Sequence, residues 1–259
     1  MLHNFINCLY IYVNMALLKI VLSIIVVIVV IFLMFQTLRT RHYIQIGVAL
    51  ADAADKVKFS QNPPNSTMRI LIIGDSTIVG TGAGDPKASL AGLVGNTFPN
   101  AVIVNNGING RKTKSLLNDM ELLNESYDFI MLHTGGNDIV RFTNLKQVEE
   151  EISALLKVVK KKANKVTLAS TGNVGTALLF PFGSRWAWDK RTRQVREIYM
   201  RVAKENDVPY VDLFREPEVD PFYSKPDEYY AADYFHPSPV GYALWYERIE
   251  PVITKVASK

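Results

Sequence analysis

Ser76 occupies a position where a nucleophilic side chain can reach a substrate. The apolar run of residues 70–73 ends abruptly at Gly74-Asp75-Ser76, and turn-forming residues follow. A short aliphatic run bounded by glycine is typical of a buried strand in a parallel sheet. Ligands of such sheets bind beyond the carboxyl ends of the strands, so Ser76 is a candidate nucleophile. The alternative is that Asp75 and Ser76 only cap the next helix.

Two further predicted strands end in small polar residues. Residues 105–110 (NNGING) follow one strand, and residues 134–138 (TGGND) follow the next. Because parallel strands end at a shared edge, we expect a hydroxyl, glycine amides and a carboxamide to converge there. This set suits acyl transfer, which requires a nucleophile, a base and donors directed at the oxygen that becomes negative.

The base in such a set is expected to be a histidine, and after residue 68 the chain offers His133 and His236. His133 ends a predicted strand, where a packed or backbone-bonded ring is the favoured interpretation. His236 follows Asp233 by three residues, so the carboxylate can lie beside the ring within one turn. Such a carboxylate orients the imidazole and stabilises its protonated form. Taken alone, the Asp233 and His236 pair is also explained by a surface turn.

Together, these segments resemble the SGNH hydrolases, also called GDSL-type hydrolases, a family of lipase-like and esterase-like enzymes. The resemblance covers residues 68–256. It rests on GDST around Ser76, NNGINGRKT around Gly110, GGND around Asn137, and DYFHP around Asp233 and His236.

The resemblance implies a role for each of these residues. Ser76 is the expected nucleophile and supplies one oxyanion-binding amide, Gly110 supplies a second amide, and Asn137 supplies a side-chain donor. His236 is the expected base, and Asp233 is its orienting acid. The implied reaction is hydrolysis of carboxylic esters, either small molecules or lipids such as lysophospholipids, without a metal or an organic cofactor.

Several alternatives stay open. Gly107 competes with Gly110 for the glycine role, although the Ile-x-Gly-x-x-Thr frame fits Gly110. An O-acyltransferase would use the same acyl-enzyme. The glycines of residues 80–84 (GTGAG) suggest a non-catalytic nucleotide-binding module, although their spacing departs from the dinucleotide-binding pattern. Arg111 and Lys112 suggest a site rim that favours anionic substrates. The apolar residues 176–188 suggest either an acyl-chain wall or lid, or ordinary core packing.

The elements around these residues alternate between strand-length apolar runs and segments of helical period, which predicts βαβ units. We expect helices at residues 145–159, at about 184–206 and after Ser238-Pro239. The predicted fold class is α/β, a three-layer α/β/α sandwich with a five-stranded parallel sheet, which the resemblance describes further as flavodoxin-like. The expected strands are residues 69–73, 101–105, 128–133, 165–170 and 209–214.

Residues 20–35 form an uncharged apolar stretch ahead of these elements. With its apolar flank the stretch matches a bilayer core and exceeds a typical signal-peptide core. We therefore expect a retained N-terminal transmembrane helix, with a cleaved signal or a buried core helix as alternatives. The expected organisation is a membrane anchor over residues 1–38, a linker over 39–67 and an SGNH hydrolase domain over 68–259.

Charge and cysteine content add few constraints. Lys19 precedes the apolar stretch and Arg39 and Arg41 follow it, which leaves the side of the membrane undecided. The resemblance implies an extracytoplasmic side. The sole cysteine, Cys8, precedes the stretch, so we expect no disulfide inside the hydrolase domain. The net charge of +4 comes with no nucleic-acid motif, so the basic residues are expected to form solvated helix faces and no nucleic-acid partner is expected.

Overall fold

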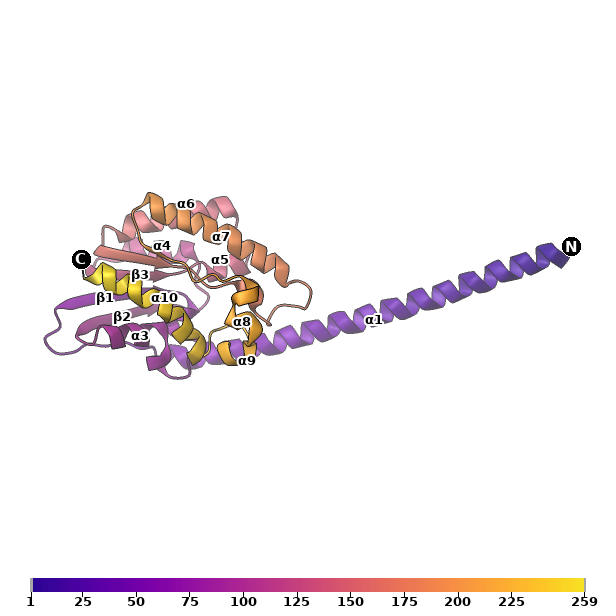
Figure 1. The fold of residues 1–259 in the computed structure, drawn as a ribbon, viewed down its shortest axis with the longest axis horizontal. Helices are drawn as coiled ribbons and strands as arrows, with labels where there is room; N and C mark the ends of the chain where they lie inside the picture. Colours follow the sequence, from indigo (N-terminus) through magenta and orange to yellow (C-terminus); the bar gives the residue numbers. More distant parts are fainter. Residues whose placement is uncertain (1, 259) are drawn as a thin grey trace. The chain divides into compact units, whose positions relative to one another are not determined.

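The computed structural model describes residues 2–258, of which residues 2–9, 11 and 13 are described without their side chains. The prediction about Cys8 therefore concerns a side chain that lies outside the described part of the structure. The chain divides into two compact units, Met1–His42 and Tyr43–Lys259 (Figure 1). The predicted domain boundaries at residues 38 and 67 stay predictions.

Helix α1 (Leu2–Asp55) contains the apolar stretch. Within the described chain, its segment Asn14–Asp55 is the one helix long and apolar enough to cross a membrane, and an 18-residue window of this segment has a mean hydropathy of 3.3. Apolar side chains are exposed on all sides of residues 20–35, as shown by Ile28 and Leu33, which are 59% and 58% exposed. Such a helix suits a lipid environment rather than a protein core, and is a candidate for a membrane anchor or a signal sequence.

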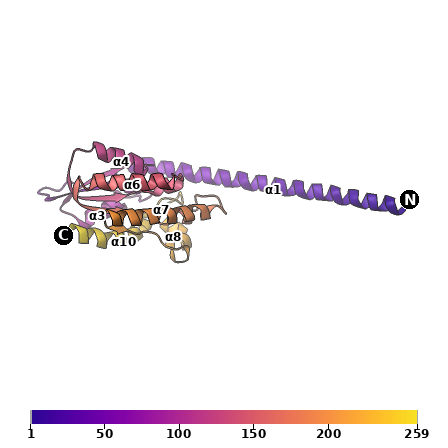
Figure 2. The same ribbon diagram turned by 90° about the horizontal axis from the view of Figure 1, so that it is seen from above.

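The second unit is built on a five-stranded parallel sheet with the strand order β2-β1-β3-β4-β5. Helices α4, α6 and α7 pack together on one face, and α3 and α10 cover the other (Figures 1 and 2). The predicted α/β/α fold class is confirmed. The strands are β1 (Met68–Gly74), β2 (Ala101–Gly107), β3 (Tyr127–His133), β4 (Ala163–Ala169) and β5 (Tyr210–Val211).

The longer helices of this unit are α3 (Leu90–Thr97), α4 (Thr113–Leu122), α6 (Leu145–Val159), α7 (Arg185–Glu205) and α10 (Pro239–Ala257). The remaining helices are the short α2 (Ser76–Val79), α5 (Gly136–Val140), α8 (Pro221–Ser224) and α9 (Pro226–Tyr229) and the 3-10 turns η1 (Pro86–Ala88), η2 (Val174–Thr176) and η3 (Pro217–Val219). The three predicted helices correspond to α6, α7 and α10. Helix α10 begins as expected, because Ser238 Oγ accepts the Gly241 N–H at 3.2 Å and Pro239 occupies the first turn.

Strand β5 is shorter than the predicted residues 209–214. The chain leaves the sheet at Asp212, whose carboxylate accepts the Phe214 N–H at 3.2 Å and pairs with Arg196 at 2.5 Å. A side chain that bonds the backbone two residues ahead favours a turn over a continuing strand.

The core lies on both faces of β1 and β3, as expected for central parallel strands. Residues Ile70 and Ile73 at the two ends of the β1 apolar run are completely buried. The predicted apolar stripe of α6 is buried against the sheet, with Ile152 and Leu155 inaccessible to solvent. This packing holds the carboxyl end of β1 rigidly at the edge where the candidate residues gather.

Candidate active site

Ser76 is the first residue of α2, directly after β1. Strand β1 ends at Gly74, where a side chain would lie 2.1 Å from the His133 carbonyl oxygen of β3, so only glycine fits this close strand contact. Asp75 caps α2 by accepting the Thr77 N–H at 3.0 Å. The capping alternative is therefore correct for Asp75, and this cap leaves the Ser76 side chain at the sheet edge.

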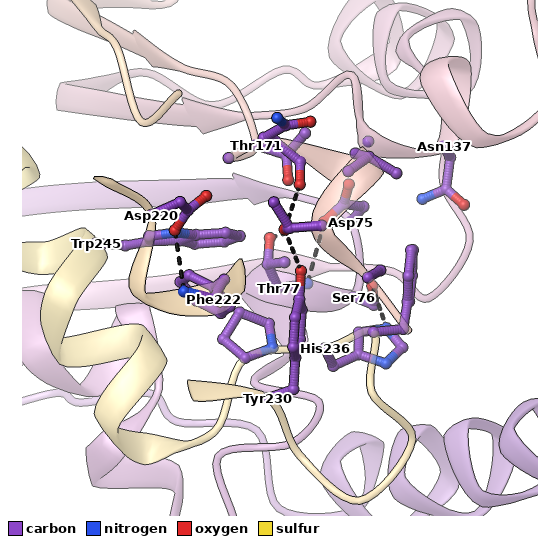
Figure 3. A pocket seen from close by; sticks show the side chains of 18 residues that line it. Asp75, Ser76, Thr77, Asn137, Thr171, Asp220, Phe222, Tyr230, His236 and Trp245 are labelled. Atoms are coloured by element: carbon purple, nitrogen blue, oxygen red, sulfur yellow. Dashed lines mark hydrogen bonds between the residues drawn. The ribbon is translucent and has the colours of Figure 1, made fainter. Parts of the chain in front are cut away.

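His236 lies between Ser76 and Asp233. Its Nε2 is 3.0 Å from Ser76 Oγ (Figure 3). Its Nδ1 is 2.5 Å from Asp233 Oδ2. The other Asp233 oxygen accepts the backbone N–H groups of Phe235 and His236 at 3.1 and 3.0 Å. Asp233 is 1% exposed, so this carboxylate is fixed in place by three donors in a region that excludes water.

Gly110 and Asn137 reach the same place from two other strand ends. Both line a pocket together with Ser76 and His236. Gly110 has a φ of +73°, the left-handed conformation that favours glycine. Gly107 has a different task, because a side chain there would lie 2.5 Å from the Val79 backbone nitrogen. Gly107 therefore lets β2 pack against α2, which favours Gly110 for the role at the pocket.

Two pockets meet at Ser76 and His236. The first, which we call the inner pocket, combines polar side chains such as Thr171 and Asp220 with aromatic rings such as Trp245 (Figure 3). The second, which we call the helix-side pocket, has a mainly apolar lining. An ester has two parts on either side of its carbonyl carbon, so a nucleophile between two pockets suits such a substrate.

His133 belongs to a buried network beneath the site. Its Nδ1 is 2.8 Å from Thr77 Oγ1, and the Thr77 hydroxyl donates to Asp75 at 2.8 Å. Because that hydroxyl proton is directed at Asp75, His133 Nδ1 carries the proton that it donates to Thr77. Burial lowers the pKa of His133, which keeps the ring neutral, and the ring stacks on Trp245. His133 is therefore a packed ring, as the sequence favoured.

Arg111 does not form a rim of the site. The residue is buried at 4% exposure, and its guanidinium donates to the Asn106 carbonyl oxygen at 2.7 Å and pairs with Asp119 at 2.8 Å. The predicted rim that favours anionic substrates is wrong for this residue, because the Asn106 carbonyl at the end of β2 binds the side chain inward. Lys112 is also engaged, donating to Thr143 Oγ1 at 3.0 Å.

Gly82 contributes to the site in a way that sequence reasoning missed. Its φ is +91°, and a side chain there would lie 2.5 Å from the Pro237 carbonyl oxygen and 3.2 Å from His236 Cβ. The glycine-rich segment after α2 thus lets the loop that carries His236 approach Ser76. The only sequence signal was the density of glycines in residues 80–84, which had suggested a nucleotide-binding module instead.

Comparison with known proteins agrees with this geometry. Residues 72–244 match the model of the GDSL-like Lipase/Acylhydrolase family, which covers more than half of the chain. The chain belongs to this family. The predicted resemblance is confirmed, and the protein is a serine ester hydrolase of the GDSL type. A comparison with curated protein sequences finds no match.

Solved structures with the same fold include several esterases. A member of the lipolytic protein G-D-S-L family from Veillonella parvula aligns with a TM-score of 0.59 and 18% identity, over 73% of this chain and 99% of that one. An acetyl xylan esterase from Geobacillus stearothermophilus aligns with a TM-score of 0.54 and 19% identity, over 72% and 94%. The psychrotrophic esterase EstA from Pseudoalteromonas aligns with a TM-score of 0.55 and 16% identity, over 74% and 99%. At these identities the likeness shows a common fold.

Asp220 gives this hydrolase a pH-dependent stability. Burial raises the pKa of Asp220 to about 6, from an ordinary value of 3.8. The folded protein therefore binds this proton more tightly than the unfolded chain, and stability falls as the pH rises from roughly 4 to 6. We expect Asp220→Asn, which keeps an oxygen to accept the Phe222 N–H, to raise the melting temperature relative to the parent more at pH 7 than at pH 4.

Melting curves across this pH range measure the effect, with the exposed Glu121→Gln variant as the control. If the difference in melting temperature between Asp220→Asn and the parent does not change with pH, Asp220 has the same pKa in the folded and unfolded states, which contradicts the prediction.

Proposed function

We propose that the enzyme hydrolyses carboxylic esters through an acyl-enzyme on Ser76. The observation that carries the proposal is the 3.0 Å approach of His236 Nε2 to Ser76 Oγ, with Asp233 holding the opposite ring nitrogen. Asp233 is an acceptor for the Nδ1 proton, so it selects the tautomer whose Nε2 lone pair faces Ser76. A nucleophile, a base and an orienting acid are thus arranged in one line.

In the first half of the reaction, Ser76 Oγ attacks the ester carbonyl carbon while its proton passes to His236 Nε2. The carbonyl oxygen becomes negative in the tetrahedral intermediate. The backbone N–H groups of Ser76 and Gly110 and the side-chain amide of Asn137 are the proposed donors to this oxygen. Support for this assignment comes from the shared pocket that Ser76, Gly110 and Asn137 line. Donors that are already in position stabilise the charge without reorganisation.

The first half ends when the bond to the leaving oxygen breaks, and the departing alcohol takes the proton from His236. A water molecule then attacks the acyl-enzyme, with His236 again accepting a proton, and the acid leaves as Ser76 is restored. An alcohol in place of water would make the enzyme an O-acyltransferase. The polar side of the inner pocket, with Thr171 and Asn173, suits either a leaving or an accepting alcohol. Product analysis with an added alcohol distinguishes the two reactions.

Replacing the nucleophile tests the proposal directly. We expect Ser76→Ala in the full-length chain, purified in detergent, to lose hydrolysis of p-nitrophenyl butyrate down to the background rate, because no oxygen remains to form the acyl-enzyme. The exposed Ser115→Ala variant is the matched control and should retain the parent activity. A Ser76→Ala enzyme as active as Ser115→Ala would refute the assignment.

Replacing Asn137 tests the oxyanion assignment. We expect Asn137→Ala to lower kcat by about 10² to 10³ with a small change in KM, because the lost hydrogen bond forms mainly in the transition state. Steady-state kinetics measure both constants, and a melting curve checks that the variant is folded. An unchanged kcat would assign the stabilisation of the oxyanion to the backbone amides alone.

We further propose that α1 anchors the enzyme in a membrane as a single-pass helix, with the catalytic unit on the extracytoplasmic side. The apolar, exposed surface of α1 supports the anchor, and the family resemblance supports the side. With a tag at the C-terminus, protease added to spheroplasts should remove the tag while the cells stay intact. A tag that is cleaved only after lysis would place the catalytic unit in the cytoplasm.

A further inference from the structure

We infer that the C-terminal turns of α1 form the acyl-chain wall of the active site, with Ile44 and Val48 as residues that determine acyl specificity. The inference rests on the proposed function and names its substrate class, which is esters of acyl chains much longer than acetyl. These turns belong to the same compact unit as Ser76, because that unit begins at Tyr43.

Gly47 brings this helix directly against the catalytic acid. A side chain at Gly47 would lie 2.9 Å from Asp233 Oδ2, the same oxygen that binds His236 Nδ1. Atoms do not approach a methyl group this closely without a shift, so the absence of a side chain permits the contact. Gly47 is therefore a positioning residue that lets α1 pack beside the Asp233–His236 pair.

Two further contacts hold the helix at the site. The Tyr43 ring lies edge-on to the Tyr234 ring with centroids 5.1 Å apart, and Tyr234 is the neighbour of Asp233 in sequence. Asn109 Nδ2 donates to the Ala51 carbonyl oxygen at 3.3 Å, and Asn109 is the neighbour of Gly110. These contacts join the helix to the loop that carries Asp233 and to the loop that carries Gly110. The helix is therefore a structural part of the site.

One face of the helix lines the helix-side pocket. Tyr43, Ile44, Gly47, Val48 and Ala51 all line it, and this spacing of three and four residues places them on one side of a helix. Leu179 and Phe235 supply apolar lining from other segments, and Ser76, Gly110 and Asn137 complete the pocket. Within residues 176–188, Leu179 therefore belongs to the acyl-chain wall that we infer. Phe180 instead stacks on Trp188 and packs in the core.

Ile44 and Val48 retain apolar surface for a ligand to cover. Their exposed fractions are 51% and 55%, although both side chains line the pocket. The inner pocket is the less suitable place for a hydrocarbon chain, because the Asp220 carboxylate and the Thr171 hydroxyl line it. A hydrocarbon chain that covers such polar groups removes them from water, which costs free energy. The acyl chain therefore lies in the helix-side pocket, and the alcohol lies in the inner pocket.

The test compares a short and a long ester in the full-length enzyme in detergent. Each methylene that the pocket buries is expected to raise kcat/KM by about fourfold, so p-nitrophenyl octanoate should be preferred to p-nitrophenyl acetate. The double variant Ile44→Ser/Val48→Ser should lower kcat/KM for the octanoate by about tenfold or more, and for the acetate by less than about twofold. Partitioning of the octanoate into detergent is the same for all variants and cancels in this comparison.

The double variant Gln45→Ser/Ala49→Ser is the matched control, since both residues are exposed on the same turns and neither lines the pocket. This control variant should keep the parent enzyme's preference for the octanoate over the acetate ester. Gly47→Ala should lower kcat for both esters alike and change the pH profile of kcat/KM, because its methyl group meets the acid rather than the acyl chain.

The inference would be overturned if Ile44→Ser/Val48→Ser lost kcat/KM equally for the acetate and the octanoate. It would also be overturned if the variant kept the parent kcat/KM for both esters. Either result, combined with an inactive Ser76→Ala, leaves the proposed function standing. An active Ser76→Ala would instead refute the proposed function itself.

Discussion

The structure of the site depends on holding both nitrogens of the His236 ring at once. Asp233 binds one nitrogen, Ser76 lies at the other, and these residues come from opposite ends of the catalytic unit. A displacement of either end breaks the arrangement, because hydrogen bonds weaken steeply with distance and angle. The fold meets this requirement through Tyr242 of α10, whose hydroxyl donates to the Thr81 carbonyl oxygen at 2.7 Å. This buried bond joins the segment after His236 to the segment after Ser76.

The nucleophile is held from below by a network that excludes water. The chain His133–Thr77–Asp75 links the end of β3 to the first turn of α2 through buried hydrogen bonds. In a region of low dielectric such bonds are strong, and an unpaired member is costly. The network therefore fixes the short α2 helix, which has too few backbone hydrogen bonds to be rigid alone. Ser76 lies at the start of that helix, and its position follows from this network.

The last turns of α1 give the apolar helix a second role. The helix contains the candidate membrane span, and its turns from Tyr43 onward also pack at the Asp233 carboxylate and line the pocket beside Ser76. The packing relies on Gly47, where any side chain would collide with the acid. An apolar helix face that lines the pocket at Ser76 favours substrates with a hydrocarbon part, because such a face gains free energy only when apolar surface covers it. One helix therefore contains both the candidate membrane span and the proposed acyl-chain wall.

The sequence by itself determined the class of the fold and named the candidate residues of the site. Strand-length runs and helical periodicity indicated the parallel sheet, because burial patterns are local. The polar residues at strand ends indicated a shared edge at Ser76, and the family resemblance singled out Gly110 and Asn137 there. Sequence reasoning failed where a residue's role depends on distant partners, because Arg111 turned inward and the glycines after α2 shape the approach of His236. It also missed the local turn at Asp212 that ends β5 early. Only the tertiary structure brought the end of α1 to Asp233. Such contacts join segments far apart in the chain, and no local pattern of residue types encodes the distance between them.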